Sequence, residues 1–80
     1  MAKTKKKVVI YASKTCPWCK KTKEFFKANK VKYTEKDVAN KKNAQEMIKK
    51  SGQTGVPVID IGGEIVIGYD EAKLKRELGL

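Results

Sequence analysis

The side chains in this 80-residue chain best suited to chemistry are two cysteines, Cys16 and Cys19. They are its only thiols, and two residues separate them. Positions i and i+3 share one face of a helical turn, so the two sulfurs can meet. If that turn begins a helix, free backbone N–H groups and the helix dipole stabilise a thiolate at Cys16. The pattern predicts thiol–disulfide exchange, with Cys16 as the nucleophile and Cys19 as the resolving thiol.

The two residues between the cysteines fit this interpretation. Pro17 suits the first turn of a helix, where no backbone N–H is needed. Trp18 offers a large flat surface beside the reacting sulfur. It either contacts the substrate or covers the edge of the helix, and the sequence leaves both roles open.

A structural or metal-binding role fits the cysteine pair less well. A structural disulfide would close a very short loop and stabilise little. A zinc site needs about four N or S ligands, and the chain has two cysteines and no histidine, so only a dimer could supply them. A shared iron–sulfur cluster has the same requirement. A chance pair of buried cysteines does not account for the position of the motif between an expected strand and an expected helix. We expect no metal and no bound organic cofactor.

Composition and charge narrow the class of protein. The net charge is +10, but the lysines are spread along the chain among acidic residues, so we expect no specific nucleic-acid partner. No apolar run approaches the ~20 residues that span a bilayer, so we expect no membrane partner. The apolar run at 8–12 is too short for a signal-peptide core. We therefore expect a cytoplasmic monomer, in a compartment where structural disulfides are rare.

The pattern of apolar residues predicts four strands and three helices around these cysteines. Strands are expected at 8–12, 31–38, 56–61 and 64–67, with a turn at Gly62-Gly63. Helices are expected at 17–29 and 41–50 and, last, from a cap at Asp70 through Leu78. The expected N-caps of the first two helices are Ser13 or Thr15, and Asn40. The expected inward residues are Cys19, Thr22, Phe25 and Phe26, then Ala44, Met47 and Ile48, then Ala72, Leu74 and Leu78.

The element order β-α-β-α-β-β-α predicts one α/β domain over residues 1–80, with 1–7 as a basic, frayed start. The first β-α-β unit implies two parallel strands, and the closing hairpin adds antiparallel ones. The result is a four-stranded mixed sheet flanked by three helices.

Three stretches in register resemble the glutaredoxins of the thioredoxin-fold superfamily. They are Thr15-Cys16-Pro17-Trp18-Cys19, similar to the family's Cys-Pro-Tyr-Cys, then Thr54-Gly55-Val56-Pro57-Val58, similar to its Thr-Val-Pro segment, and Gly68-Tyr69-Asp70, similar to its Gly-Gly-x-Asp segment. The likeness extends over nearly the whole chain. It implies a thioredoxin-like fold and a small dithiol enzyme that reduces protein disulfides or glutathione mixed disulfides.

The resemblance also implies a glutathione site. It implies a cis peptide bond at Pro57 that faces the cysteines, with the backbone of Val56 presented to glutathione or to an extended peptide. It assigns Lys14 to a glutathione carboxylate and Asp70 to the γ-glutamyl amine. Backbone groups of Gly68 and Tyr69 would lie beside them. Lys14 as a plain surface lysine and Asp70 as a plain helix cap remain open alternatives.

Two departures from the family pattern leave the electron donor open. Gly55 stands where the family usually has threonine, and Ala44 stands near a position that is often a polar glutathione contact. The short length of the chain and its Gly-Val-Pro segment also resemble glutaredoxin-like redoxins that take electrons from thioredoxin reductase. Glutathione is the expected donor, and thioredoxin reductase is the alternative.

Overall fold

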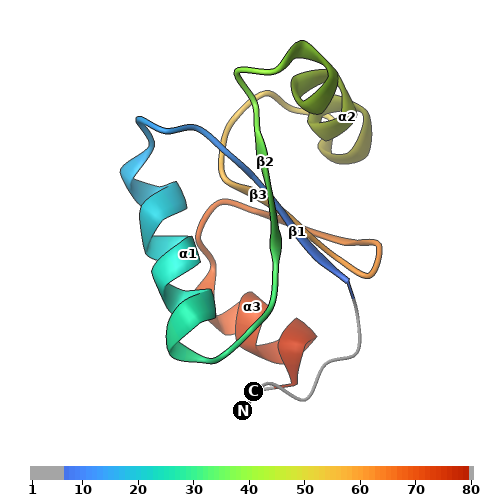
Figure 1. Cartoon of the computed structure of the whole chain (residues 1–80). Helices are drawn as coiled ribbons and strands as arrows, with labels where there is room; N and C mark the ends of the chain where they lie inside the picture. The colour runs from blue at the N-terminus through green and yellow to red at the C-terminus, as the bar shows by residue number, and fades with distance from the viewer. Residues whose placement is uncertain (1–6, 80) are drawn as a thin grey trace.

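The computed structural model describes residues 7–79 and has the predicted order of strands and helices (Figure 1). The elements are β1 (Val8–Ala12), α1 (Pro17–Ala28), β2 (Thr34–Asp37), α2 (Lys41–Ser51), β3 (Val58–Ile61), β4 (Glu64–Ile67) and α3 (Glu71–Leu78).

The strands form one mixed sheet in the order β2-β1-β3-β4. β1 runs parallel to β2, with Val9 opposite Thr34, and antiparallel to β3, with Ile10 opposite Ile59. β3 and β4 form the antiparallel hairpin. Both the parallel pair and the hairpin agree with the prediction. β1 is thus an inner strand, and the chain leaves its end directly into the cysteine motif.

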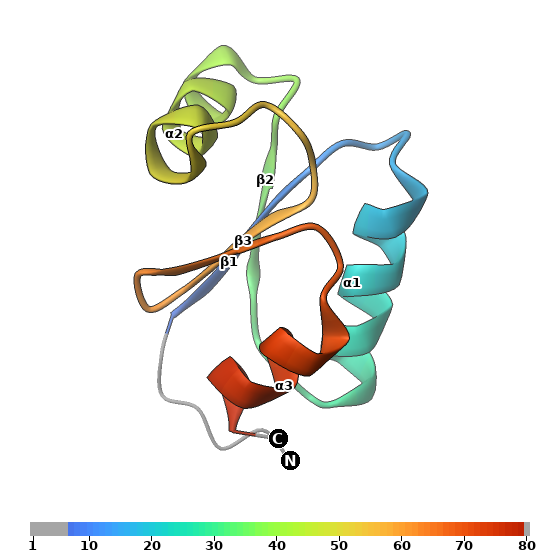
Figure 2. The ribbon, with the colours of Figure 1, turned by 180° about the vertical axis from the view of Figure 1, so that it is seen from behind.

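Successive side chains of β1 point to opposite faces of the sheet and build two cores. Val8, Ile10 and Ala12 pack in the larger core with residues of α1 and α3. Val9 and Tyr11 pack in the smaller core with Met47 of α2. The two ribbon views accordingly show α1 and α3 on one side of the sheet and α2 on the other (Figures 1 and 2). A strand covered on both faces is apolar throughout, as this one is.

The face of α1 that enters the larger core is the predicted one. Cys19, Thr22, Phe25 and Phe26 are its buried residues. The buried hydroxyl of Thr22 donates to the carbonyl oxygen of Trp18 at 2.8 Å, so it carries no unpaired donor into the core. Burial of this stripe holds the N-terminus of α1, and with it the cysteine motif, at the end of β1.

The predicted faces of α2 and α3 are each wrong at one residue. Ile48 is 41% exposed, although Met47 beside it is buried. Ala72 is exposed, although Leu74 and Leu78 are buried. Each of these two helices therefore buries a narrower stripe of side chains than the sequence suggested.

Two strands begin later than predicted. β2 begins at Thr34, because the chain at Val31 is still bonded to the end of α1: the Val31 N–H donates to the carbonyl oxygen of Phe26 at 2.8 Å. β3 begins at Val58, because Pro57 has no N–H to offer to a sheet ladder.

Two of the predicted helix starts are confirmed. The Asn40 side chain caps α2 by accepting from the N–H groups of Lys42 and Asn43, and the Asp70 side chain caps α3 by accepting from that of Lys73. The predicted cap of α1 is wrong, because Cys16 itself is the N-cap. The hydroxyls of Ser13 and Thr15 instead bond to each other at 3.1 Å in the preceding turn.

The predicted frayed start falls mostly on residues 1–6, which lie outside the described residues. Lys7 is described, and its carbonyl oxygen accepts from the N–H of Gly62 in the hairpin turn at 3.0 Å. Lys7 is thus bonded to the hairpin turn, and the frayed start stays a prediction for the residues before it.

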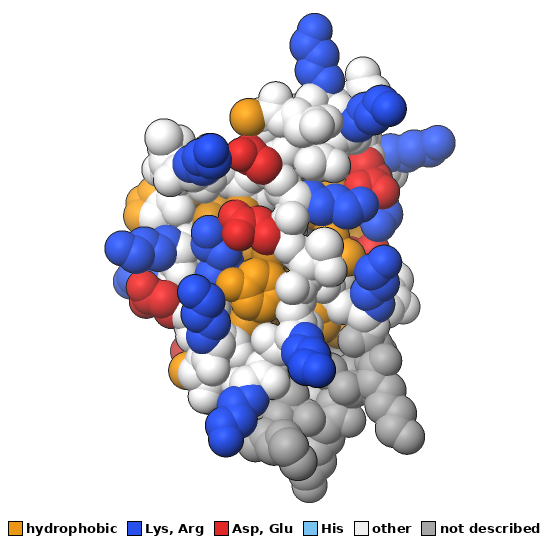
Figure 3. Space-filling model, viewed as in Figure 1, with side chains coloured by type: hydrophobic (Ala, Val, Ile, Leu, Met, Phe, Trp, Pro, Cys, Tyr) orange, Lys and Arg blue, Asp and Glu red, His pale blue; other side chains and the backbone are white. Residues whose placement is uncertain are grey.

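Among residues 7–79, no helix has the length and apolar composition needed to cross a membrane. The face seen in Figure 3 carries basic side chains scattered over it, with carboxylates and apolar side chains between them. The positive charge is thus distributed over several elements, as the sequence indicated.

Candidate active site

Cys16 lies where β1 gives way to α1, and its sulfur caps the helix. Its Sγ accepts a hydrogen bond from the backbone N–H of Cys19 at 3.3 Å. This N–H is one of the first donors of a helix, which have no partner within the helix itself. A thiolate accepts such a bond more strongly than a thiol, and the helix dipole acts in the same direction. The Cys16 side chain is half-buried, so a substrate sulfur can reach it.

Cys19 lies one turn further along and is completely buried. Burial, together with a hydrogen bond to the Cys16 side chain, raises the pKa of the Cys19 thiol from an ordinary 9.0 to about 11. Both cysteines are free thiols in the structure. Cys19 is thus held protonated, one helical turn behind Cys16.

The loop before β3 reaches the cysteines from the far end of the sequence. The cis peptide bond expected between Val56 and Pro57 is present. The Cys16 thiol donates to the carbonyl oxygen of Val56, with the sulfur 3.9 Å from that oxygen. The Pro57 carbonyl oxygen in turn accepts from the N–H of Gly68 at 2.8 Å. These bonds place the three predicted segments of the site side by side.

An apolar pocket of about 240 Å³ lies at this junction, lined by Trp18, Val56, Pro57, Gly68 and Tyr69. Its aromatic wall is a stacked pair, Trp18 and Tyr69, with ring centroids 6.3 Å apart. Trp18 is 53% exposed, and the amine of Lys21 lies 4.9 Å from its ring centroid. Trp18 thus packs on Tyr69 and lines the pocket, and its contact with a substrate stays a prediction. Gly68 has a backbone φ of +78°, a conformation that residues other than glycine rarely adopt.

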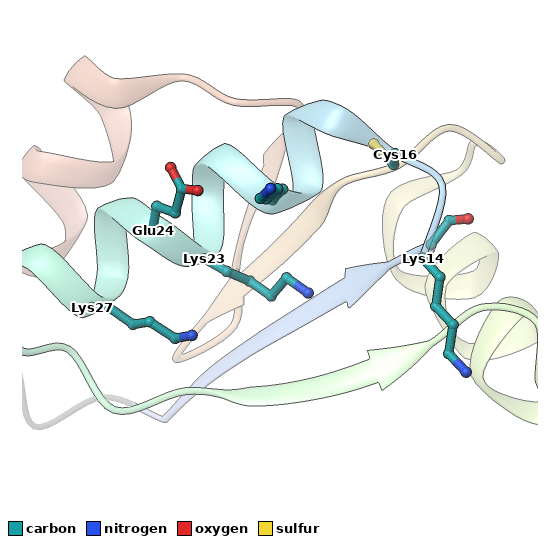
Figure 4. Close-up of a pocket in the computed structure, with 7 residues that line it drawn as sticks. Lys14, Cys16, Lys23, Glu24 and Lys27 are labelled. Carbon is teal, nitrogen blue, oxygen red and sulfur yellow. The ribbon is translucent and has the colours of Figure 1, made fainter.

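Lys14 and Asp70 lie apart from the lining of this pocket. Lys14 lines a separate hollow that contains Cys16 and the exposed side of α1 (Figure 4). The Asp70 carboxylate accepts from the N–H of Lys73 at 3.1 Å, as the cap of α3. The helix-cap role of Asp70 is thus present, and its carboxylate is exposed at the end of the segment that lines the pocket.

One residue that holds the loop, Gln53, was missed by the sequence reasoning. Its side chain bonds to both backbone groups of Gly55, accepting from the N–H at 2.7 Å and donating to the carbonyl oxygen at 2.9 Å. A Cβ atom at Gly55 would lie 2.7 Å from the Gln53 side-chain oxygen. The glycine therefore permits this clasp next to Val56. The nearest signal of this contact in the sequence was Gly55, which stands where the resembled family usually has threonine.

Within the described part of the chain, no three or more cysteine, aspartate or glutamate side chains gather closely enough to hold a metal ion. A metal or cluster at the cysteines would need ligands from a second molecule.

The family model for glutaredoxin matches residues 8–66, which include the cysteines, the cis-proline loop and most of the sheet. This chain belongs to the glutaredoxin family. Its membership supports a thiol–disulfide oxidoreductase function, in agreement with the chemistry of the cysteine pair.

Similar proteins support this assignment. A glutaredoxin-like 8.6 kDa protein encoded in the rubredoxin operon of Clostridium pasteurianum, itself uncharacterised, is 43% identical over 86% of this chain and 93% of its own length. Glutaredoxin 3 of Escherichia coli is 37% identical over 80% of this chain and 78% of its own. The crystal structure of a glutaredoxin from Archaeoglobus fulgidus has a TM-score of 0.80 and 32% identity, and it covers 90% of this chain and 85% of its own. The fold is thus the thioredoxin-like fold that was predicted.

Proposed function

We propose that this glutaredoxin is a dithiol reductase of protein disulfides and glutathione mixed disulfides, and that it works in the cytoplasm. The arrangement of Cys16 is the observation that carries the proposal. Its sulfur accepts the Cys19 N–H at the start of α1, and it is the more accessible of the two thiols. A sulfur in that setting is stabilised as the attacking thiolate.

In the first step, the Cys16 thiolate attacks one sulfur of the substrate disulfide. A new S–S bond forms between Cys16 and that sulfur, and the other half of the substrate leaves as a thiolate that takes a proton from water. The apolar pocket formed by Trp18, Val56, Pro57, Gly68 and Tyr69 would hold the part of the substrate that stays attached.

In the second step, two routes release the attached group. Cys19 loses its proton and attacks the Cys16 sulfur, which closes the Cys16–Cys19 disulfide and completes the transfer of two electrons to the substrate. Alternatively, a glutathione thiolate attacks the sulfur of the attached group, which leaves as a disulfide with glutathione and returns Cys16 as a thiolate. Because the Cys19 thiol has a pKa near 11, it does not compete with Cys16 in the first step. Cys19 becomes an effective nucleophile only when the mixed disulfide forms at Cys16 beside it.

Glutathione is the proposed electron donor, and no cofactor needs to be bound. Two molecules would reduce the Cys16–Cys19 disulfide and become glutathione disulfide. A buckwheat glutaredoxin has been solved as a complex with glutathione, and at 22% identity it shares the fold with this chain. By family resemblance, Val56 and Tyr69 would offer backbone groups, and Lys14 and Asp70 would offer charges. Thioredoxin reductase is the alternative donor.

The first experiment follows NADPH oxidation with a small mixed-disulfide substrate in two cuvettes. One contains glutathione and glutathione reductase, and the other contains thioredoxin reductase alone. Turnover only with glutathione supports the proposed donor. Turnover only with thioredoxin reductase leaves the cysteine chemistry in place and refutes the glutathione site. No turnover in either cuvette, with metal or a cluster in the purified protein, would instead favour a dimeric metal-binding module.

Asp70 allows a sharper test of the glutathione site. Asp70→Asn removes the carboxylate charge but retains an oxygen that can cap α3. We expect a higher KM for glutathione with an unchanged melting temperature. An unchanged KM would leave Asp70 as a helix cap only.

A further inference from the structure

Cys16 lines a second hollow of the molecule, which shares no lining residue with the apolar pocket. This hollow, called here the lysine groove, has a volume of about 310 Å³ and is lined by Ser13, Lys14, Cys16, Lys20, Lys23, Glu24 and Lys27. Such a volume is at the lower end of the range for ligand sites, roughly 300–1,000 Å³. It is suited to a few side chains of a peptide. The nucleophile thus lies between an apolar pocket and a strongly basic one.

The lysines of the groove lie on one side of α1. Lys20, Lys23 and Lys27 are spaced by three and four residues, so they share a helix face. In Figure 4, the side chains of Lys23 and Lys27 extend from the same side of α1, and Lys14 extends from the loop beyond its start. Cys16 lies at the end of this row.

Most of this charge is not neutralised within the chain. The Lys23 amine is 3.0 Å from the Glu35 carboxylate on β2, which pairs it. Over residues 7–79, Lys14, Lys20 and Lys27 make no ion pair. Glu24 is the one carboxylate in the lining, so the groove carries four lysines against a single acidic side chain.

We propose that the lysine groove binds an acidic segment of the target protein, next to the cysteine whose disulfide Cys16 attacks. This inference rests on the proposed function and adds the class of substrate to it. The target is a protein disulfide flanked by Asp or Glu, because the unpaired ammonium groups of Lys20 and Lys27 favour carboxylates. A protein segment fits better than a nucleic acid, because the groove ends at a nucleophile whose substrates are disulfides.

The test compares two peptides of equal length, each with one cysteine in a mixed disulfide with glutathione. One peptide has Glu on both sides of the cysteine, and the other has Gln at the same positions. The measured quantity is the ratio of their kcat/KM values at low and high salt. We expect the wild-type protein to prefer the acidic peptide by about tenfold at low salt, and the preference to fall towards unity at high salt.

The variant that tests the groove is Lys20→Gln/Lys27→Gln, and the matched control is Lys42→Gln/Lys49→Gln. Both remove two positive charges, but Lys42 and Lys49 are exposed on α2, across the sheet. We expect the groove variant to lose the acidic preference and to keep its turnover of the Gln peptide. The control should keep the preference. Equal losses in the two variants would show that only net charge matters and would overturn the proposal.

A binding measurement separates this proposal from the proposed function. Fluorescence anisotropy with the Glu peptide, its cysteine replaced by serine, needs no redox chemistry. If turnover is absent but binding depends on Lys20 and Lys27, the groove is supported and the reductase proposal fails. If the groove variant binds this peptide as well as the control does, the groove is refuted. Equal binding of a single-stranded oligonucleotide of the same charge would refute selectivity for an acidic protein.

Discussion

The start of α1 holds two cysteine side chains, Cys16 and Cys19, in two different settings. Cys16 is half-buried, caps the helix and accepts a backbone N–H. Cys19 is buried against the larger core, and its pKa is raised to about 11. Under the proposed mechanism, the accessible Cys16 sulfur attacks the substrate and the buried Cys19 sulfur resolves the mixed disulfide. Helix position and burial, rather than residue type, would then assign the two roles.

The substitution with the largest expected effect on this contrast between the two cysteines is Cys16→Ser. A serine hydroxyl is not ionised near neutral pH, and it cannot form the mixed disulfide. We expect turnover of every disulfide substrate to fall by on the order of a thousandfold or more. The measurement is NADPH oxidation in the coupled assay, with circular dichroism to establish that the variant is folded. Retained activity would show that the roles are assigned wrongly.

The next test is Cys19→Ser, which should affect only one class of substrate. We expect reduction of protein disulfides to be lost, because no second thiol can release the mixed disulfide. Exchange with glutathione mixed disulfides should remain largely intact, since glutathione itself resolves the intermediate. A buried hydroxyl costs roughly 1–3 kcal/mol, so Cys19→Ala serves as a second variant. Equal loss on both substrates in both variants would contradict the resolving role.

The pH dependence of stability should also distinguish Cys19. Its pKa is about 11 in the folded protein and near 9.0 when exposed, so between these values the unfolded chain has lost a proton that the folded chain keeps. The contribution of the protonated Cys19 thiol to the free energy of unfolding is fully present below pH 9 and is lost as the pH rises towards 11. Urea unfolding of the reduced protein at pH 8 and pH 10 measures this. Cys19→Ala should show a smaller decrease in stability over that interval, and an equal decrease would argue against a raised pKa.

The smallest expected effect concerns the loop that faces Cys16. Gln53→Ala removes both bonds to Gly55, and the loop that places the Val56 carbonyl oxygen next to Cys16 loosens. We expect about a threefold lower kcat/KM and a loss of about 1 kcal/mol in the free energy of unfolding. The matched control is Gln45→Ala, at an exposed position on α2. If the two variants behave alike, the clasp has no role in the site.

The order of elements and the inner face of α1 were predictable, because both depend on local patterns. The apolar run of β1 and the buried stripe of Cys19, Thr22, Phe25 and Phe26 follow from period and residue type. The helix caps Asn40 and Asp70 were predictable for the same reason, because each bonds to backbone N–H groups two or three residues away. The errors at Ile48 and Ala72 arose because a helical pattern does not say how wide a strip the sheet will cover.

The sequence by itself determined the chemistry of the site and the family. Two cysteines at i and i+3, between an apolar run and a helical pattern, already predict dithiol exchange. Only the tertiary structure decided what surrounds Cys16, because its neighbours come from distant parts of the chain. The Val56 carbonyl lies forty positions away, and the wall of the apolar pocket joins Trp18 to Tyr69 across the fold. The gathering of lysines beside Cys16 also depends on the fold, because the turn after β1 brings Lys14 to the face of α1 that carries Lys20 and Lys27.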